Sequence, residues 1–141
     1  MPHTQKSAIT VETTVKAPAE KVWELLTKPE HIVHWNYASD DWECLHAEND
    51  LRIGGRFLYT MSAKDGTSVF DFSGMYIKVE KERELSFTLD DGRVVAITLV
   101  ENEGGVKLTE TFEMEEENPA ELQKRGWQAI LDNFKKYGEK N

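Results

Sequence analysis

Cysteine is nearly absent from this sequence. Cys44 is the single one among 141 residues, and a lone thiol cannot close a disulfide within the chain. Because chains without disulfides are typical of reducing compartments, we expect a cytoplasmic protein. Long apolar runs are also missing. The opening segment MPHTQKSAIT lacks the apolar core of a signal peptide, and no stretch reaches membrane-spanning length, so we expect no membrane association.

Positive charge is scarce. The chain carries 17 Lys and Arg against 26 Asp and Glu, which gives a formal net charge of -9. Proteins bind nucleic acids mainly through Lys and Arg at the phosphates, so we expect no nucleic-acid partner. The same charge disfavours anionic membrane surfaces. The densest basic group, Lys135, Lys136 and Lys140, lies near the end of the chain, where it complements the dipole of a helix.

Motifs of the common cofactor and hydrolase sites are missing as well. The sequence contains no GxSxG, no phosphate-binding loop, no GxGxxG and no HExxH, so we expect no cofactor and no metal centre. His31 and His34 could share a helix face, but without further ligands at metal-site spacing a solvated surface is favoured. Cys44 and His46 alternate onto one face of a strand, and a structural role is favoured because no third orienting residue accompanies them.

What the sequence does contain is typical of one folded domain. Hydrophobic residues make up 39% and charged residues 30% of the chain, and this length suits a single core. The 4 Trp, 4 Tyr and 6 Phe suffice for a large core and for a cavity lined with rings. We predict a flexible segment over residues 1–8, a single domain over residues 9–138 and a short tail over residues 139–141.

Alternating apolar and polar residues predict a sheet over most of the chain. One strand, 9–15, precedes two short helices, at about 18–28 and 29–35. After residue 40 the pattern is strand after strand, separated by turn signals such as Asp91-Gly92, so we predict an antiparallel meander. Its strands are predicted over 41–46, 56–62, 69–80, 85–89, 95–99 and 106–114.

Two of the predicted helices carry capping signals. Thr27 with Glu30 fits a capping box for the second short helix, and Asn118 before Pro119 fits the start of a long final helix. That helix runs to about residue 137, roughly 30 Å at 1.5 Å per residue. A one-sided helix must bury its apolar stripe, and the concave face of the sheet is the one large partner. The stripe consists of Leu122, Gly126, Trp127, Ile130, Leu131 and Phe134.

The fold class that follows is α+β, with a curved antiparallel sheet of about seven strands, two short helices and a long C-terminal helix across the concave face. Five strings in this order resemble the SRPBCC superfamily, whose START-like and birch-pollen-allergen-like members have the helix-grip fold. Within it they resemble the branch related to the C-terminal domain of activators of the heat-shock-protein-90 ATPase. The strings are APAEKVWELLTKPEHIVHW (17–35), GGRFLYTM (54–61), FSGMYIKVEKERELSFT (72–88), TETFE (109–113) and GWQAILDNFKKY (126–137).

The resemblance implies a deep cavity between the sheet and the long helix. Relatives hold lipids, sterols, polyketides, flavonoid-like compounds or plant hormones there, and some are cyclases or dehydratases. The chaperone activators themselves carry a further N-terminal domain, for which this chain has no room, so a chaperone partner is disfavoured but stays open as an alternative. We expect a monomer or a weak dimer that binds a small apolar or amphipathic ligand.

Ring-bearing and aliphatic residues on the inward faces are the candidate ligand-binding set. They could line a cavity, because small-molecule sites are mostly apolar with a few polar anchors. They could equally fill a solid core, which close packing makes the ordinary outcome. The resemblance favours the cavity. Together with Glu110, the set comprises Trp35, Phe57, Tyr59, Met61, Phe70, Phe72, Phe87, Trp127, Ile130, Leu131 and Phe134.

Glu110 is the polar residue of greatest interest, because alternation along 106–114 places it inward between apolar neighbours. Burial would raise its pKa, and it could then act as a general acid or base beside Tyr59, or bind a ligand hydroxyl. Alternatively, a bulge turns it outward, or it pairs with a basic residue. Gly126 lies on the helical stripe, where close approach to the sheet is the favoured explanation over free space for a ligand.

The sequence therefore predicts first a non-catalytic domain that binds a lipid-, polyketide- or flavonoid-like molecule. The first alternative is a cyclase- or dehydratase-type enzyme with Glu110 and Tyr59 as its catalytic candidates. The second alternative is an interaction protein related to chaperone ATPase activation, which needs no cavity.

Overall fold

Seven strands and three helices make up the computed structural model, which describes residues 7–141. In chain order they are β1 (Ala8–Val15), α1 (Ala19–Thr27), α2 (Pro29–Ile32), β2 (Trp42–Asn49), β3 (Arg56–Ala63), β4 (Val69–Glu80), β5 (Glu84–Leu89), β6 (Val94–Asn102), β7 (Gly105–Glu113) and α3 (Ala120–Lys140).

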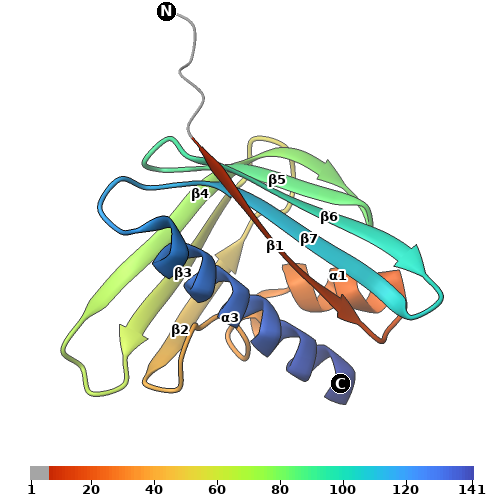
Figure 1. Ribbon diagram of the computed structural model, residues 1–141, viewed down its shortest axis with the longest axis horizontal. Coiled ribbons are helices and arrows are strands. Elements are labelled where there is room, and N and C mark those ends of the chain that lie inside the picture. Colours follow the sequence, from red (N-terminus) through yellow and green to blue (C-terminus); the bar gives the residue numbers. More distant parts are fainter. Residues whose placement is uncertain (1–6) are drawn as a thin grey trace, which may run out of the picture.

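The strands form one antiparallel sheet in the spatial order β1-β7-β6-β5-β4-β3-β2. Strands β2 to β7 form a continuous meander, and β1 pairs antiparallel with β7. The two edge strands are therefore β1 and β2, which α1 and α2 connect along the chain. Figure 1 shows the sheet curving around α3, which crosses its concave side and ends close to α1. The predicted α+β helix-grip architecture is confirmed.

The element boundaries differ from the predicted ones at several places, of which three bear on the predictions above. The second short helix ends at Ile32 after one turn, and β2 continues to Asn49 instead of ending at residue 46. A register shift between Cys44 and His46 interrupts the alternation on which the prediction of β2 depended. Residues 1–8 were predicted to be flexible. Residues 1–6 lie outside the described part of the chain, and β1 already begins at Ala8.

Both predicted capping residues are wrong. The Thr27 hydroxyl donates to the backbone oxygen of Trp23 (2.8 Å), inside α1, and Lys28 occupies the N-cap position of α2. Pro119 occupies that position in α3, and the Asn118 side chain donates to Glu115 instead. A short polar side chain bonds whichever backbone or side-chain group lies nearest, so its identity alone does not fix the boundary of a helix. At its other end α3 extends to Lys140, past the predicted end.

Gln123 holds the loop between β7 and α3 in place of a capping residue. Its side-chain nitrogen donates to the backbone oxygens of Glu115 (3.0 Å) and Asn118 (2.7 Å), and its side-chain oxygen accepts the N–H of Glu115 (3.0 Å). The side chain is buried. These three bonds fix where the chain leaves the sheet, and therefore where α3 begins.

The C-terminal half of α3 packs tightly against the rest of the core. Phe134 is fully buried, and its ring meets the Trp35 ring edge-on with centroids 4.9 Å apart. One turn later a Cβ on Gly138 would lie 3.0 Å from Cγ1 of Val15 in β1, which is closer than almost any side chain tolerates. The missing side chain at this position lets the helix lie directly on β1.

No helix in the described part of the chain combines the length and the apolarity that crossing a bilayer requires.

We expect Phe134→Ala to lower the free energy of unfolding by about 3–5 kcal/mol, because it removes a fully buried ring and leaves a cavity. Leu122→Ala, on the same helix but 51% exposed, should cost less than about 1 kcal/mol. Chemical denaturation of both variants measures the difference. Equal losses would contradict the assignment of the C-terminal half of α3 as the anchored half.

Candidate functional site

A pocket of about 430 Å³ lies between the N-terminal half of α3 and the concave face of the sheet. Its volume is within the range of small-molecule sites. The sheet contributes residues from β3, β4, β5, β6 and β7, the segment after α2 closes one side, and α3 forms the roof. Its lining residues are Leu26, Trp35, Asn36, Ala38, Tyr59, Met61, Phe70, Phe72, Tyr76, Leu85, Phe87, Arg93, Ile97, Glu110, Glu115, Asn118, Leu122, Gln123, Gly126, Trp127, Ile130 and Leu131.

Gly126 shows that the N-terminal half of α3 stands away from the sheet. A Cβ built on it would meet no atom within 4 Å, in contrast to Gly138 three turns later. The expectation that Gly126 permits close approach of helix and sheet is therefore wrong. This glycine borders open space, and the same helix is packed at one end and raised at the other.

Ten of the twelve predicted ligand-binding residues line the pocket. The two that do not are Phe57 and Phe134, which are buried in the solid core behind it. The Phe57 ring is instead surrounded by the rings of Tyr59, Tyr76 and Phe87. The inward set therefore divides into a filled part and an open part, whereas the sequence treated the two as alternatives.

Trp127 keeps the roof at a distance from the floor. Its ring stacks on Phe112 of β7, with centroids 4.0 Å apart and planes 9° apart, and meets Phe72 of β4 edge-on at 6.2 Å. Each aromatic pair of this kind contributes roughly 0.5–1.5 kcal/mol beyond the burial of its area. The indole thus acts as a spacer between α3 and two strands of the sheet.

The mouth of the pocket has an apolar rim. Phe70 of β4 and Leu122 of α3 line the pocket, yet about half of each side chain is exposed, 49% and 51%. Phe70 is held by a T-shaped contact with Trp42 of β2. Large side chains left this open are common at the edges of binding sites.

Glu110 of β7 faces into the pocket, as the alternation predicted, and only 8% of it is exposed. No hydrogen bond or ion pair joins its carboxyl to another residue between 7 and 141. In that part of the chain no fully buried side-chain oxygen lacks a partner, so the carboxyl oxygens must open onto the pocket. Burial raises the pKa of Glu110 to about 8. The alternatives of an outward bulge and of a basic partner are both excluded.

Tyr59 of β3 lines the same pocket as Glu110, and its hydroxyl is hydrogen-bonded to that of Tyr76. Burial, the adjoining Tyr76 hydroxyl, the Cys44 thiol and the Glu110 carboxyl raise the pKa of Tyr59 well above its ordinary value. Tyr76, whose pKa burial raises to about 12, donates to the side-chain oxygen of Asn49 (2.5 Å). The phenols are therefore neutral at physiological pH and can exchange hydrogen bonds with a ligand.

Five charged or amide side chains of the lining were not among the ligand-binding candidates: Asn36, Arg93, Glu115, Asn118 and Gln123. The period-two signal that found Glu110 could have found Arg93, since it is in phase with Val95 and Ile97, but the strand was predicted to begin at residue 95. Asn36 and Gln123 carry no comparable signal. Their positions depend on the loop after α2 and on the three backbone bonds of Gln123.

The histidines considered as metal ligands face Tyr137 of α3. Nδ1 of His31 lies 2.7 Å from the Tyr137 hydroxyl oxygen, and the His34 ring stacks on the Tyr137 ring at 5.6 Å. Within residues 7–141 no three His, Cys, Asp or Glu side chains cluster closely enough to hold a metal ion. Cys44 is buried and contacts the backbone oxygen of His46, whose ring pairs with Glu48.

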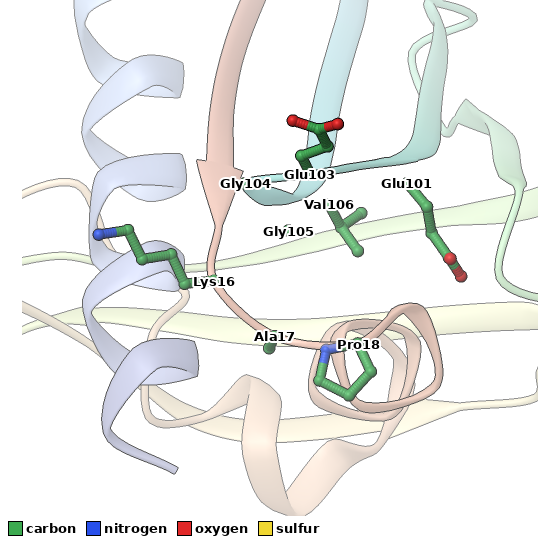
Figure 2. A pocket seen from close by; sticks show the side chains of 8 residues that line it. All are labelled: Lys16, Ala17, Pro18, Glu101, Glu103, Gly104, Gly105 and Val106. Carbon is green, nitrogen blue, oxygen red and sulfur yellow. The ribbon is translucent and has the colours of Figure 1, made fainter.

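A second hollow, of about 540 Å³, lies at the surface where the turn between β6 and β7 meets the start of α1. Figure 2 shows that the side chains of Lys16, Glu101 and Glu103 point away from one another around it. A binding site needs polar groups that converge on one ligand. This hollow has none that converge, so the pocket beneath α3 is the candidate site.

The profile of one protein family matches residues 16–139 of the chain. Its description is "Activator of Hsp90 ATPase homolog 1-like protein". The chain belongs to this family. No curated protein matches it.

Solved structures agree with this assignment. An AHSA1-like protein from Aeromonas hydrophila is 42% identical, with a TM-score of 0.90 over 95% of this chain and 93% of that one. A protein from Cytophaga hutchinsonii is 44% identical, with a TM-score of 0.79 over 96% and 93% of the two chains. A protein from Chromobacterium violaceum, at 23% identity and a TM-score of 0.86 over 94% and 98%, is similar in fold.

Because Glu110 is buried, we predict that the free energy of unfolding depends on pH. In the folded protein Glu110 keeps its proton up to about pH 8, whereas the ordinary pKa of a glutamate side chain, as in an unfolded chain, is 4.5. Between these pH values the folded state binds more protons, so the free energy of unfolding falls as the pH rises. We expect Glu110→Gln to remove this dependence, which amounts to on the order of 4 kcal/mol across the window. Thermal unfolding of both proteins from pH 5 to pH 8 measures it.

Glu121→Gln is the matched control, because Glu121 is exposed in the first turn of α3. Its unfolding midpoint should follow the wild type at every pH. A constant difference between Glu110→Gln and the wild type from pH 5 to pH 8 would show that the carboxyl titrates normally and is open to bulk water.

Proposed function

We propose that this protein binds a small, largely apolar molecule of the lipid, polyketide or flavonoid kind in the pocket beneath α3. The observation that carries the proposal is the open space at Gly126, in a pocket whose lining includes several aromatic rings and the Glu110 side chain. Empty space of this size is costly in a protein interior, because its lining loses the contacts that close packing would supply. A ligand would restore those contacts.

The polar groups of the pocket fit an orienting role. Apolar side chains give affinity through burial, at about 25 cal/mol per Å² of area removed from water. They give little direction, which one or two hydrogen bonds supply. A protonated Glu110 can donate to a carbonyl or hydroxyl oxygen of a ligand, and the Tyr59 hydroxyl can donate or accept.

An acid–base function of the cyclase or dehydratase kind is a second candidate, supported by the presence of Glu110 and Tyr59 in the lining of one pocket. A carboxyl with a pKa of about 8 is poised to transfer a proton near neutral pH. Mass spectrometry of ligands incubated with the protein tests this candidate. Conversion by the wild type that persists unchanged in Glu110→Gln would refute it.

Gly126→Leu tests the binding function directly. The added side chain projects into the pocket, where nothing obstructs it, and takes the volume that a ligand needs. Titration with N-phenyl-1-naphthylamine, a neutral dye that fluoresces in apolar surroundings, measures the affinity. We expect at least about tenfold weaker binding than by the wild type, a difference of about 1.4 kcal/mol.

Gly126→Ala is the matched control. It adds one methyl group at a helical position and should raise stability by about 0.5–1 kcal/mol while leaving most of the volume open. Its dye affinity should remain within about threefold of the wild type, less than 1 kcal/mol. Equal affinity of all three proteins would place the dye elsewhere, and failure of the wild type to bind it would count against the proposal.

A further inference from the structure

Arg93 is the one cationic side chain among the residues that line the pocket. It directly precedes β6 and is in phase with Val95 and Ile97, whose side chains point inward. Only 14% of its side chain is exposed, although Asp91, its partner, is 54% exposed. A guanidinium so nearly enclosed at the edge of an apolar pocket requires a physical explanation, since buried charges are paired or bind something.

The pairing with Asp91 uses only part of the guanidinium. Nε donates to Oδ2 of Asp91 (2.8 Å), and Oδ1 of Asp91 accepts the backbone N–H of Arg93 (3.1 Å). No hydrogen bond to a residue of the described part of the chain uses Nη1 or Nη2. Fully buried side-chain nitrogens without a partner are also absent from that part, so these two groups must reach open space.

The acidic residues close to Arg93 have other partners. Glu113 accepts the backbone N–H of Val94 (2.7 Å), and Glu115 accepts from the Asn118 side chain (2.6 Å). Asp91 therefore orients the guanidinium, while its outer edge retains up to four N–H donors in one plane. Such an edge matches the two oxygens of a carboxylate.

Arg93 and Glu110 stand at separate points of the same pocket. The register pairs Ile97 of β6 with Glu110 of β7, and Arg93 is four residues before Ile97, which is roughly 13 Å along a strand. Val95 and Phe112, fully buried and apolar, pair between them. A molecule that reached both polar points would lie along an apolar floor.

From this arrangement we propose that the ligand is an amphipathic anion, with a carboxylate bound to Arg93 and an apolar body beneath Trp127 that extends toward Glu110 and Tyr59. This inference rests on the proposed function and specifies its ligand class. The guanidinium and the Glu110 carboxyl lie at separate points of the pocket, so a ligand that bound both would have one orientation. The chain's net charge of -9 makes a local cation necessary for an anion to stay bound.

Decanoate and decan-1-ol test the proposal, because they share an alkyl chain and differ in the head group. Each displaces N-phenyl-1-naphthylamine from the pocket, and the fall in fluorescence gives its affinity. We expect Arg93→Gln to weaken decanoate about tenfold or more, as loss of a charge-assisted hydrogen bond requires. Decan-1-ol should change by less than about threefold. Arg93→Lys keeps the charge without the planar edge and should restore part of the loss.

Arg56→Gln is the matched control. Arg56 also pairs with an aspartate next to the same hairpin, Asp90 (2.6 Å), but it is exposed and outside the pocket lining. Its affinities for both compounds should equal those of the wild type. Thermal unfolding midpoints of all variants verify that each is folded. If Arg93→Gln does not fold, the affinities of Arg93→Lys for decanoate and decan-1-ol are compared with those of the wild type instead.

The outcomes separate the two proposals. Dye binding by the wild type with equal losses for decanoate and decan-1-ol in Arg93→Gln, or with no loss for either, leaves the binding function standing and overturns the assignment of Arg93. If the wild type binds none of the three molecules, neither the dye nor decanoate nor decan-1-ol, the binding function and the assignment of Arg93 are both overturned. A decanoate loss of the same size in Arg56→Gln would show that the anion responds to general surface charge and would also overturn the assignment.

Discussion

The pocket exists because α3 packs directly on the sheet in its C-terminal half and stands away from it around Gly126. The C-terminal half packs through Phe134 on Trp35 and through the backbone of Gly138 on Val15. In the other half, the Trp127 ring stacks on Phe112 and separates the helix from the sheet. A straight helix cannot follow a sheet that curves away beneath it. Contact at one end and a spacer in the middle therefore leave a gap under the first turns.

That gap determines the chemistry of the polar groups inside it. A carboxyl that would be ionised in water stays protonated when apolar walls replace the solvent, and Glu110 has no partner among the described residues to reverse this effect. The Arg93 guanidinium lines the same pocket and is bonded through Nε to Asp91. Under the proposed function, the apolar walls would supply affinity, and the few polar atoms would select and orient the bound molecule.

The sequence predicted the periodic features of the fold. Alternation identified all seven strands and the inward position of Glu110, and the stripe from Leu122 to Phe134 identified α3. Features that depend on single nonperiodic contacts were not predicted correctly: the caps proposed at Thr27 and Asn118 were wrong, and the role of Gln123 was missed.

Gly126 shows why the site was harder to predict than the fold. A small residue on a helical stripe fits close packing and open space equally well, and only the three-dimensional separation of helix and sheet distinguishes them. The inward-facing aromatic residues posed the same problem, because the sequence could not distinguish a ring that fills the core, such as Phe57, from one that lines the pocket, such as Phe72.

Xenon binding is the most direct measurement of the central claim, that the space beneath α3 is open and apolar. Xenon enters empty apolar cavities without needing any specific group. A crystal structure under xenon pressure should place the gas between Phe72, Ile130 and Gly126. Side chains packed into that volume, with xenon absent from it, would contradict the account.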